Sequence, residues 1–258
     1  MLERTSEEKS MTKSSSTDTK WFRRHPARRA ARRRIVCLPH AGGAASFFHS
    51  WGQAFGDEVE VLAACYPGRQ ERFAEPCLDS MAPLADAVAE QLIPFLDLPV
   101  ALFGHSMGAS LAYEVALRLG DDHGDHLTGL FVSAREAPHL TTPRTVHLRT
   151  DEGLVAEAKR LGGTDSVLLD DPGLRELVLP ALRADFQISG TYRASEPVPV
   201  RCPVFGYAGD QDSVRVADMQ EWSQVSTGGF GLREFPGGHF YLIAERDRLI
   251  RDIAGRIG

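Results

Sequence analysis

The sequence predicts an α/β fold in which a mainly parallel β-sheet is covered by helices on both faces. Apolar runs of strand length alternate along the chain with amphipathic stretches of helical period. The 258 residues, 43% of them hydrophobic, are enough for one domain with a large core. The sequence shows no internal repeat. These observations favour a single layered domain.

The first predicted core strand covers residues 34–38, and the loop PHAGG at 39–43 follows it directly. Glycines in such a loop let backbone N–H groups approach a ligand closely. The simpler alternative is that these glycines only turn the chain.

A glycine-flanked serine lies in the motif GHSMG at residues 104–108. An apolar run predicts a strand over 99–103, and residues 110–119 predict a helix. Strand, serine and helix in this order form the nucleophile elbow of the α/β-hydrolase fold. We therefore predict Ser106 as the nucleophile, with the backbone N–H groups of Met107 and Ala41 as oxyanion donors. His105 should point away from the serine and pack in the core.

Residues 150–195 interrupt the alternation of strands and helices, because two amphipathic helices, at 151–161 and 173–192, follow one another there. A Gly162-Gly163 hinge and an Asp-rich linker join them. We interpret this insertion as a helical lid. Most of its apolar side chains should pack onto the core, and some should wall a substrate chamber.

The acid and the histidine should follow the serine in that order. A predicted strand at 203–208 leads to Asp210 and Asp212, and the next one, at 230–235, leads through two glycines to His239 and a last helix, 240–257. Carboxyl ends of neighbouring parallel strands gather ligand-facing residues. We predict His239 as general base and Asp212 as its orienting acid. Asp210 is the competing acid, but it is better suited to holding its own turn.

Charge is unevenly distributed. The chain carries a formal charge of −6, yet its first 34 residues contain 11 Lys or Arg against four Asp or Glu. Residues 1–20 are polar and predict a disordered tail, which leaves 21–258 as the folded domain. The basic stretch 22–34 adjoins the first core strand without a nucleic-acid-binding fold behind it, so we expect no nucleic-acid partner.

No apolar run reaches the ~18 residues of a membrane span, and charges occupy the N-terminus where a signal peptide needs an apolar core. The four cysteines show no paired spacing, which favours reduced thiols in a cytoplasmic protein. The acidic, His-containing loop 121–126 lacks further ligands at metal-site spacing, so we expect no metal site.

Four motifs in one order, PHAGG at 39–43, YPGRQER at 66–72, GHSMG at 104–108 and PGGHF at 236–240, together resemble the type II thioesterases. These are stand-alone editing hydrolases that accompany polyketide synthases and nonribosomal peptide synthetases. The resemblance covers roughly Trp21 to the C-terminus. The tail before it and the loop 121–126 depart from the family pattern.

The resemblance implies hydrolysis of acyl or aminoacyl thioesters on the phosphopantetheine arm of an acyl or peptidyl carrier protein. It also implies Ser106, Asp212 and His239 as the triad. No cofactor is expected, since phosphopantetheine belongs to the substrate. We expect a monomer, and the basic stretch 22–34 could attract an acidic carrier protein.

Three other functions would suit parts of this pattern. A general carboxylesterase would share the triad, but the YPGRQER segment and the lid favour a thioesterase. An excised terminal thioesterase that cyclises its product should lack an independent start and the Trp21 segment. A catalytically inactive binding protein should have a broken triad, whereas here every position is filled.

Overall fold

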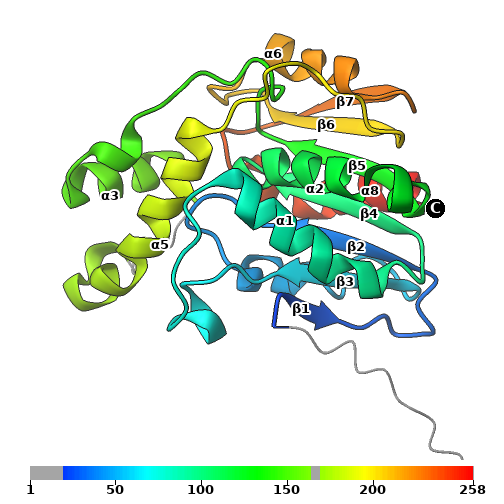
Figure 1. The fold of residues 1–258 in the computed structure, drawn as a ribbon, viewed down its shortest axis with the longest axis horizontal. Helices are drawn as coiled ribbons and strands as arrows, with labels where there is room; N and C mark the ends of the chain where they lie inside the picture. The colour runs from blue at the N-terminus through cyan, green and yellow to red at the C-terminus, as the bar shows by residue number, and fades with distance from the viewer. Residues whose placement is uncertain (1–19, 164–168, 258) are drawn as a thin grey trace, which may run out of the picture.

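The computed structural model describes residues 20–163 and 169–257, and its centre is a seven-stranded sheet (Figure 1). The strand order is β1-β3-β2-β4-β5-β6-β7, in which β1 is antiparallel to β3 and every other pairing is parallel. The strands are β1 (Phe22–His25), β2 (Arg33–Leu38), β3 (Val59–Ala64), β4 (Val100–His105), β5 (Leu127–Ser133), β6 (Val204–Gly209) and β7 (Phe230–Phe235). The predicted mainly parallel sheet is confirmed.

Helices cover both faces of this sheet, as predicted. They are α1 (Met81–Leu92), α2 (Met107–His123), α3 (Asp151–Leu161), α5 (Pro172–Thr191), α6 (Val216–Gln220), α7 (Tyr241–Ala244) and α8 (Arg246–Arg256). The expected single helix over 240–257 is wrong. It divides at Glu245, whose φ of −93° and ψ of 13° are not helical, and α8 then places Leu249, Ile250 and Ile253 in the core.

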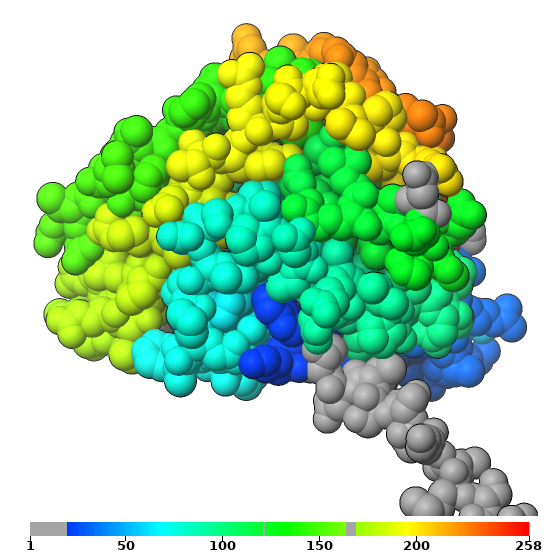
Figure 2. Space-filling view, viewed as in Figure 1, coloured from blue at the N-terminus to red at the C-terminus, as the bar shows by residue number. Residues whose placement is uncertain are grey.

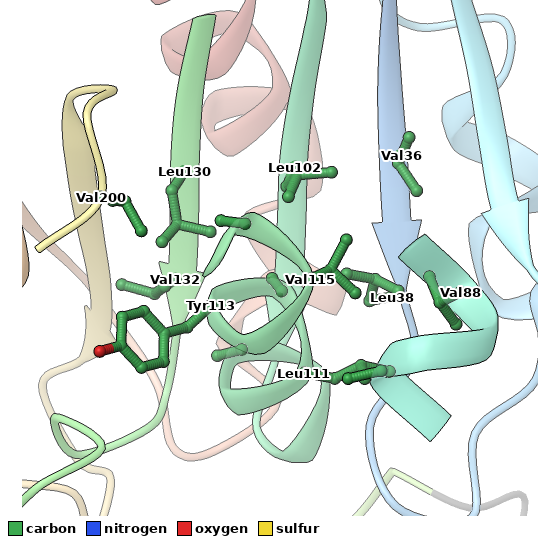
Figure 3. Packing of buried hydrophobic residues seen from close by; sticks show 14 of the residues in the cluster. Val36, Leu38, Val88, Leu102, Leu111, Tyr113, Val115, Leu130, Val132 and Val200 are labelled. Atoms are coloured by element: carbon green, nitrogen blue, oxygen red, sulfur yellow. The ribbon is translucent and has the colours of Figure 1, made fainter. Parts of the chain in front are cut away.

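Strand alternation explains why both faces of the sheet are apolar. Along β2, Val36 and Leu38 belong to one core cluster, whereas Ile35 and Cys37 belong to another. Successive strand side chains point to opposite faces, so a strand buried on both sides reads as a continuous apolar run. Figure 3 shows the first cluster, where strand side chains meet helix residues such as Val88 and Val115.

The insertion between β5 and β6 lies at one end of the sheet (Figure 1). Thr150 and Asp171 cap its two helices by accepting hydrogen bonds from Gly153 N and Leu174 N. Ile188 joins the main core, but most buried apolar side chains of the insertion do not, contrary to expectation. They pack with Val146 in a separate cluster: Leu154, Val155, Ala158, Leu169, Leu182 and Phe186.

The basic entry segment is neutralised by its neighbours. Arg34 is buried and donates to Glu60 at 2.6 Å, and Arg24 donates to the same carboxylate. The predicted disordered tail, 1–20, lies outside the described residues except for Lys20, which pairs with Glu75 at 2.9 Å. All four cysteines are free thiols. None of the helices in 20–163 and 169–257 is long and apolar enough to span a membrane.

Candidate active site

Ser106 occupies a sharp turn between β4 and α2. Its φ of 55° and ψ of −118° are strained for a residue with a side chain. A Cβ at Gly104 would lie 2.0 Å from Gly108 O, and one at Gly108 would lie 2.1 Å from Leu38 O. Both glycines are therefore required by close backbone approach, and the turn leaves Ser106 partly exposed.

The structure brings Ser106, His239 and Asp212 together. His239 Nε2 lies 3.0 Å from Ser106 Oγ, and His239 Nδ1 lies 2.9 Å from Asp212 Oδ2. Both ring nitrogens of His239 are thus taken by Asp212 and Ser106, whereas Asp210 Oδ1 accepts a hydrogen bond from Gly237 N at 2.9 Å. Its side chain therefore ties the end of β6 to the loop before His239, and it does not hold its own turn as expected.

The side chain of Asp212 is 1% exposed. Burial, the largest single influence, raises the pKa of Asp212, but the hydrogen bond and charge of His239 together with the donors at Val214 and Ser213 lower it by more in sum, so the net shift is downward. Val214 N and Ser213 Oγ also approach Asp212 Oδ1, each at 3.3 Å. A buried carboxylate held by several donors can orient one imidazole tautomer.

Both predicted oxyanion donors lie beside the serine. Met107 is the first residue of α2 and is fully buried, while Ala41 lines the same pocket as Ser106 and His239. Ala41 stands in a turn that Gly43 N closes onto His40 O at 2.9 Å. Gly42 has a φ of 76°, which type II turns require at their third residue.

Two histidines that the sequence reasoning left outside the site pack against it. His40 lies between the rings of Phe47 and Phe240, at 4.9 and 4.7 Å, and its Nε2 lies 3.3 Å from Gly163 O. Burial lowers the pKa of His40 to about 3. His105 is buried, as expected, but its ring stands 5.2 Å from His239. Each histidine lies inside a glycine-containing motif, His40 in PHAGG and His105 in GHSMG. That position is the sequence feature that could have indicated their place at the site.

The pocket at Ser106 has a polar wall that the sequence did not reveal. Arg135, Glu136, Arg144 and Glu157 line it together with apolar residues of the insertion, such as Phe186. Arg135 is buried and donates to Ser110 Oγ and Ser189 Oγ, both at 3.1 Å. The second predicted hinge glycine, Gly163, is a packing position, since its Cβ would lie 1.8 Å from the ring of Phe240.

The sheet order and the serine turn define a protein of the α/β-hydrolase fold. The thioesterase domain model matches residues 33–257, so the chain belongs to the thioesterase family. It is 44% identical over 240 residues to thioesterase PikA5 of Streptomyces venezuelae, covering 92% of this chain and 85% of that protein. It is 34% identical to the gramicidin S biosynthesis protein GrsT of Aneurinibacillus migulanus, covering 90% and 91%.

Solved structures agree. The type II thioesterase BorB from the borrelidin biosynthetic cluster is 41% identical, with a TM-score of 0.81 over 92% of this chain and 96% of that one. YbtT, the type II thioesterase of the yersiniabactin pathway, is 30% identical, with a TM-score of 0.83 over 92% and 98%. The protein is a type II thioesterase of the kind that edits polyketide and nonribosomal peptide biosynthesis.

Proposed function

We propose that Ser106, His239 and Asp212 form the catalytic triad, and that the enzyme releases acyl or aminoacyl groups from the phosphopantetheine arm of a carrier protein. The observation that carries this proposal is the pair of contacts at 3.0 and 2.9 Å that places His239 between the serine and the carboxylate. Asp212 accepts from Nδ1–H, which leaves Nε2 free to accept the Ser106 proton.

The first step transfers the acyl group to the enzyme. Ser106 Oγ attacks the thioester carbonyl while its proton passes to His239 Nε2. The amides of Ala41 and Met107 donate to the resulting oxyanion, and one such donor contributes ~3 kcal/mol in comparable enzymes. When the C–S bond breaks, His239 returns the proton to the leaving pantetheine sulfur.

The second step restores the enzyme. His239 takes a proton from water, the hydroxide attacks the Ser106 ester, and the free acid leaves as the serine recovers its proton. This chemistry uses side chains and backbone amides alone, so we propose that it requires no metal or organic cofactor. We also propose that the protein is a monomer and that it is cytoplasmic. The four free cysteines support a reducing compartment.

We propose that residues 150–195 act as a lid over the pocket. Ala158, Leu161 and Phe186 of this segment line the pocket together with Ser106 and His239. A tethered arm must therefore enter between the insertion and the sheet, and movement of the insertion would regulate that entry.

Activity on a panel of carrier proteins tests the function. Carrier proteins loaded with acetyl, butyryl, hexanoyl or an aminoacyl group should release free acid, identified by mass spectrometry. Ser106→Ala should abolish release while its thermal unfolding stays close to that of the wild type. A preference for p-nitrophenyl esters over acyl-pantetheine would instead indicate a general carboxylesterase, and a lactone product would indicate a cyclising enzyme.

A further inference from the structure

The insertion helix α5 accepts a buried hydrogen bond from the loop that carries Ala41. Asp185, 1% exposed, accepts from Gly42 N at 2.7 Å. Arg69 donates to both oxygens of the same carboxylate, at 2.6 and 2.8 Å, and to Gly43 O at 2.9 Å. Three segments that are far apart in the sequence therefore meet at one carboxylate.

The surrounding surface shows the same arrangement. In Figure 2, the yellow-green surface of α5 lies against the cyan segment that precedes α1, and Gln187 Nε2 donates to Asp79 Oδ2 across this boundary at 3.2 Å. The Arg69 guanidinium stands over the Tyr66 ring at 5.3 Å, and its side chain is only 11% exposed. The ion pair is thus a fixed part of the fold and not a surface contact.

The contact acts on one peptide group in particular. Gly42 N belongs to the peptide that joins Ala41 to Gly42, the central peptide of the turn closed by Gly43 N and His40 O. That central peptide is the group whose orientation distinguishes type I from type II turns. Holding its N–H on Asp185 keeps the turn in the type II form and therefore fixes the neighbouring Ala41 amide.

Asp185 and Arg69 have different electrostatic roles at the oxyanion hole. A carboxylate one peptide away from the oxyanion hole would repel the negative charge that develops on the substrate oxygen. Arg69, in bidentate contact, cancels that repulsion while leaving the acceptor in place for Gly42 N.

We propose that Asp185 and Arg69 are positioning residues of the oxyanion hole, through which the placement of the insertion helix controls the rate of acyl transfer. The inference rests on the proposed function, because it takes Ala41 as an oxyanion donor. A change at either residue should lower the stability of the tetrahedral state more than the affinity for the substrate.

The test compares Asp185→Asn and Arg69→Met with Glu60→Gln as a matched control. Glu60 is also a buried carboxylate that binds two arginines, but it lies in β3, away from the pocket. Each variant is assayed for kcat and KM on butyryl-pantetheine, and for inhibition by a trifluoromethyl ketone of the same chain length. This ketone forms a tetrahedral adduct with the nucleophilic serine, so its affinity reports on the oxyanion hole.

We expect Asp185→Asn to lower kcat by roughly tenfold, with KM changed less than about twofold, and to weaken the ketone by a similar factor. Arg69→Met should lower kcat by about a hundredfold, because it leaves the carboxylate uncompensated. Glu60→Gln should lower thermal stability alone. Should a single variant fail to fold, the neutral pair Arg69→Gln/Asp185→Asn carries no unpaired buried charge and gives the same comparison.

The inference is overturned if Asp185→Asn matches Glu60→Gln in kcat and ketone affinity, or if KM rises while kcat is unchanged. Ser106→Ala separates this result from the proposed function itself. If that variant still hydrolyses butyryl-pantetheine, the triad assignment fails, whatever the Asp185 variants do.

Discussion

His239 Nε2 lies 3.0 Å from Ser106 Oγ although 133 residues separate the two along the chain. The parallel sheet produces this contact, because β4 ends at the serine turn and β7 ends just before the histidine loop. A Cβ at Gly209 would lie 2.4 Å from Gly237 O, so the strand ends themselves are in close backbone contact. The short distance therefore depends on glycines as much as on the reacting side chains.

The two acids near His239 should respond very differently to removal of their charge. Asp212→Asn should lower kcat/KM by about 10³–10⁴-fold, since the amide favours the wrong imidazole tautomer. Asp210→Asn retains an oxygen that can accept from Gly237 N, so its loss should stay below about tenfold. Steady-state kinetics on butyryl-pantetheine measure both, and the reverse ranking would move the acid to Asp210.

Acid should destabilise the protein through His40. Its pKa is about 3 in the folded protein and about 6.5 in the unfolded chain, so between these values the unfolded state binds the extra proton. The free energy of unfolding is therefore highest above about pH 6.5. It declines as the pH falls, by about 2 kcal/mol at pH 5. Urea unfolding from pH 7 to pH 4.5 should show this decline.

His40→Phe should reduce that pH dependence, because the ring remains among Phe47 and Phe240 but no longer binds a proton. The exposed His126, changed to Gln, is the control and should leave the pH dependence unaltered. An unchanged slope in His40→Phe would show that other groups cause the acid sensitivity.

Adjacent glycines after α3 should tolerate a methyl group unequally. Gly163→Ala would press a Cβ into the Phe240 ring, which stands 5.3 Å from the His239 ring, so we expect kcat/KM to fall at least about tenfold. Gly162→Ala meets open space and suffers only from its φ of 88°, costing ~1 kcal/mol of stability. Equal activity in the two variants would contradict this packing role.

If Gly163 acts through His239, its variant should lose activity equally on carrier-bound and small soluble thioesters. A hinge that gates a tethered arm would instead affect the carrier-bound substrate more. The ratio of the two losses in Gly163→Ala therefore distinguishes a displaced active-site ring from restricted lid motion.

Leu169→Ala should change the preferred acyl length without removing activity. Leu169 is 1% exposed and packs in the cluster that contains Ala158 and Phe186, two residues that line the pocket. Leu249→Ala, in the core cluster that α8 packs into, should cost about 2–5 kcal/mol of stability, as Leu169→Ala should, but without altering the preference. Release rates from acetyl, butyryl and hexanoyl carrier proteins give the comparison. An identical profile in both variants would mean that this cluster only supports the fold.

Local patterns in the sequence were sufficient for most elements. The predicted bounds of α3 and β7 agree with the structure residue for residue. The capping residues, glycines and apolar spacing that set these bounds lie within a few residues of one another. Local sequence is therefore enough to determine where these elements begin and end. The glycines of the serine turn could be recognised from the motif, although only Gly104 is required by the turn itself and Gly108 is required by the approach of Leu38 O.

The break at Glu245, the separate cluster of the insertion and the Arg69–Asp185 pair could not be predicted in this way. Each depends on which surfaces meet after folding, and Asp185 reads in the sequence as one more polar position on an amphipathic helix. The sequence by itself determined the elements, their order and the types of residue available for acyl transfer. The tertiary structure decided which distant groups share a buried carboxylate or a ring contact, because those partners are chosen by packing and not by spacing along the chain.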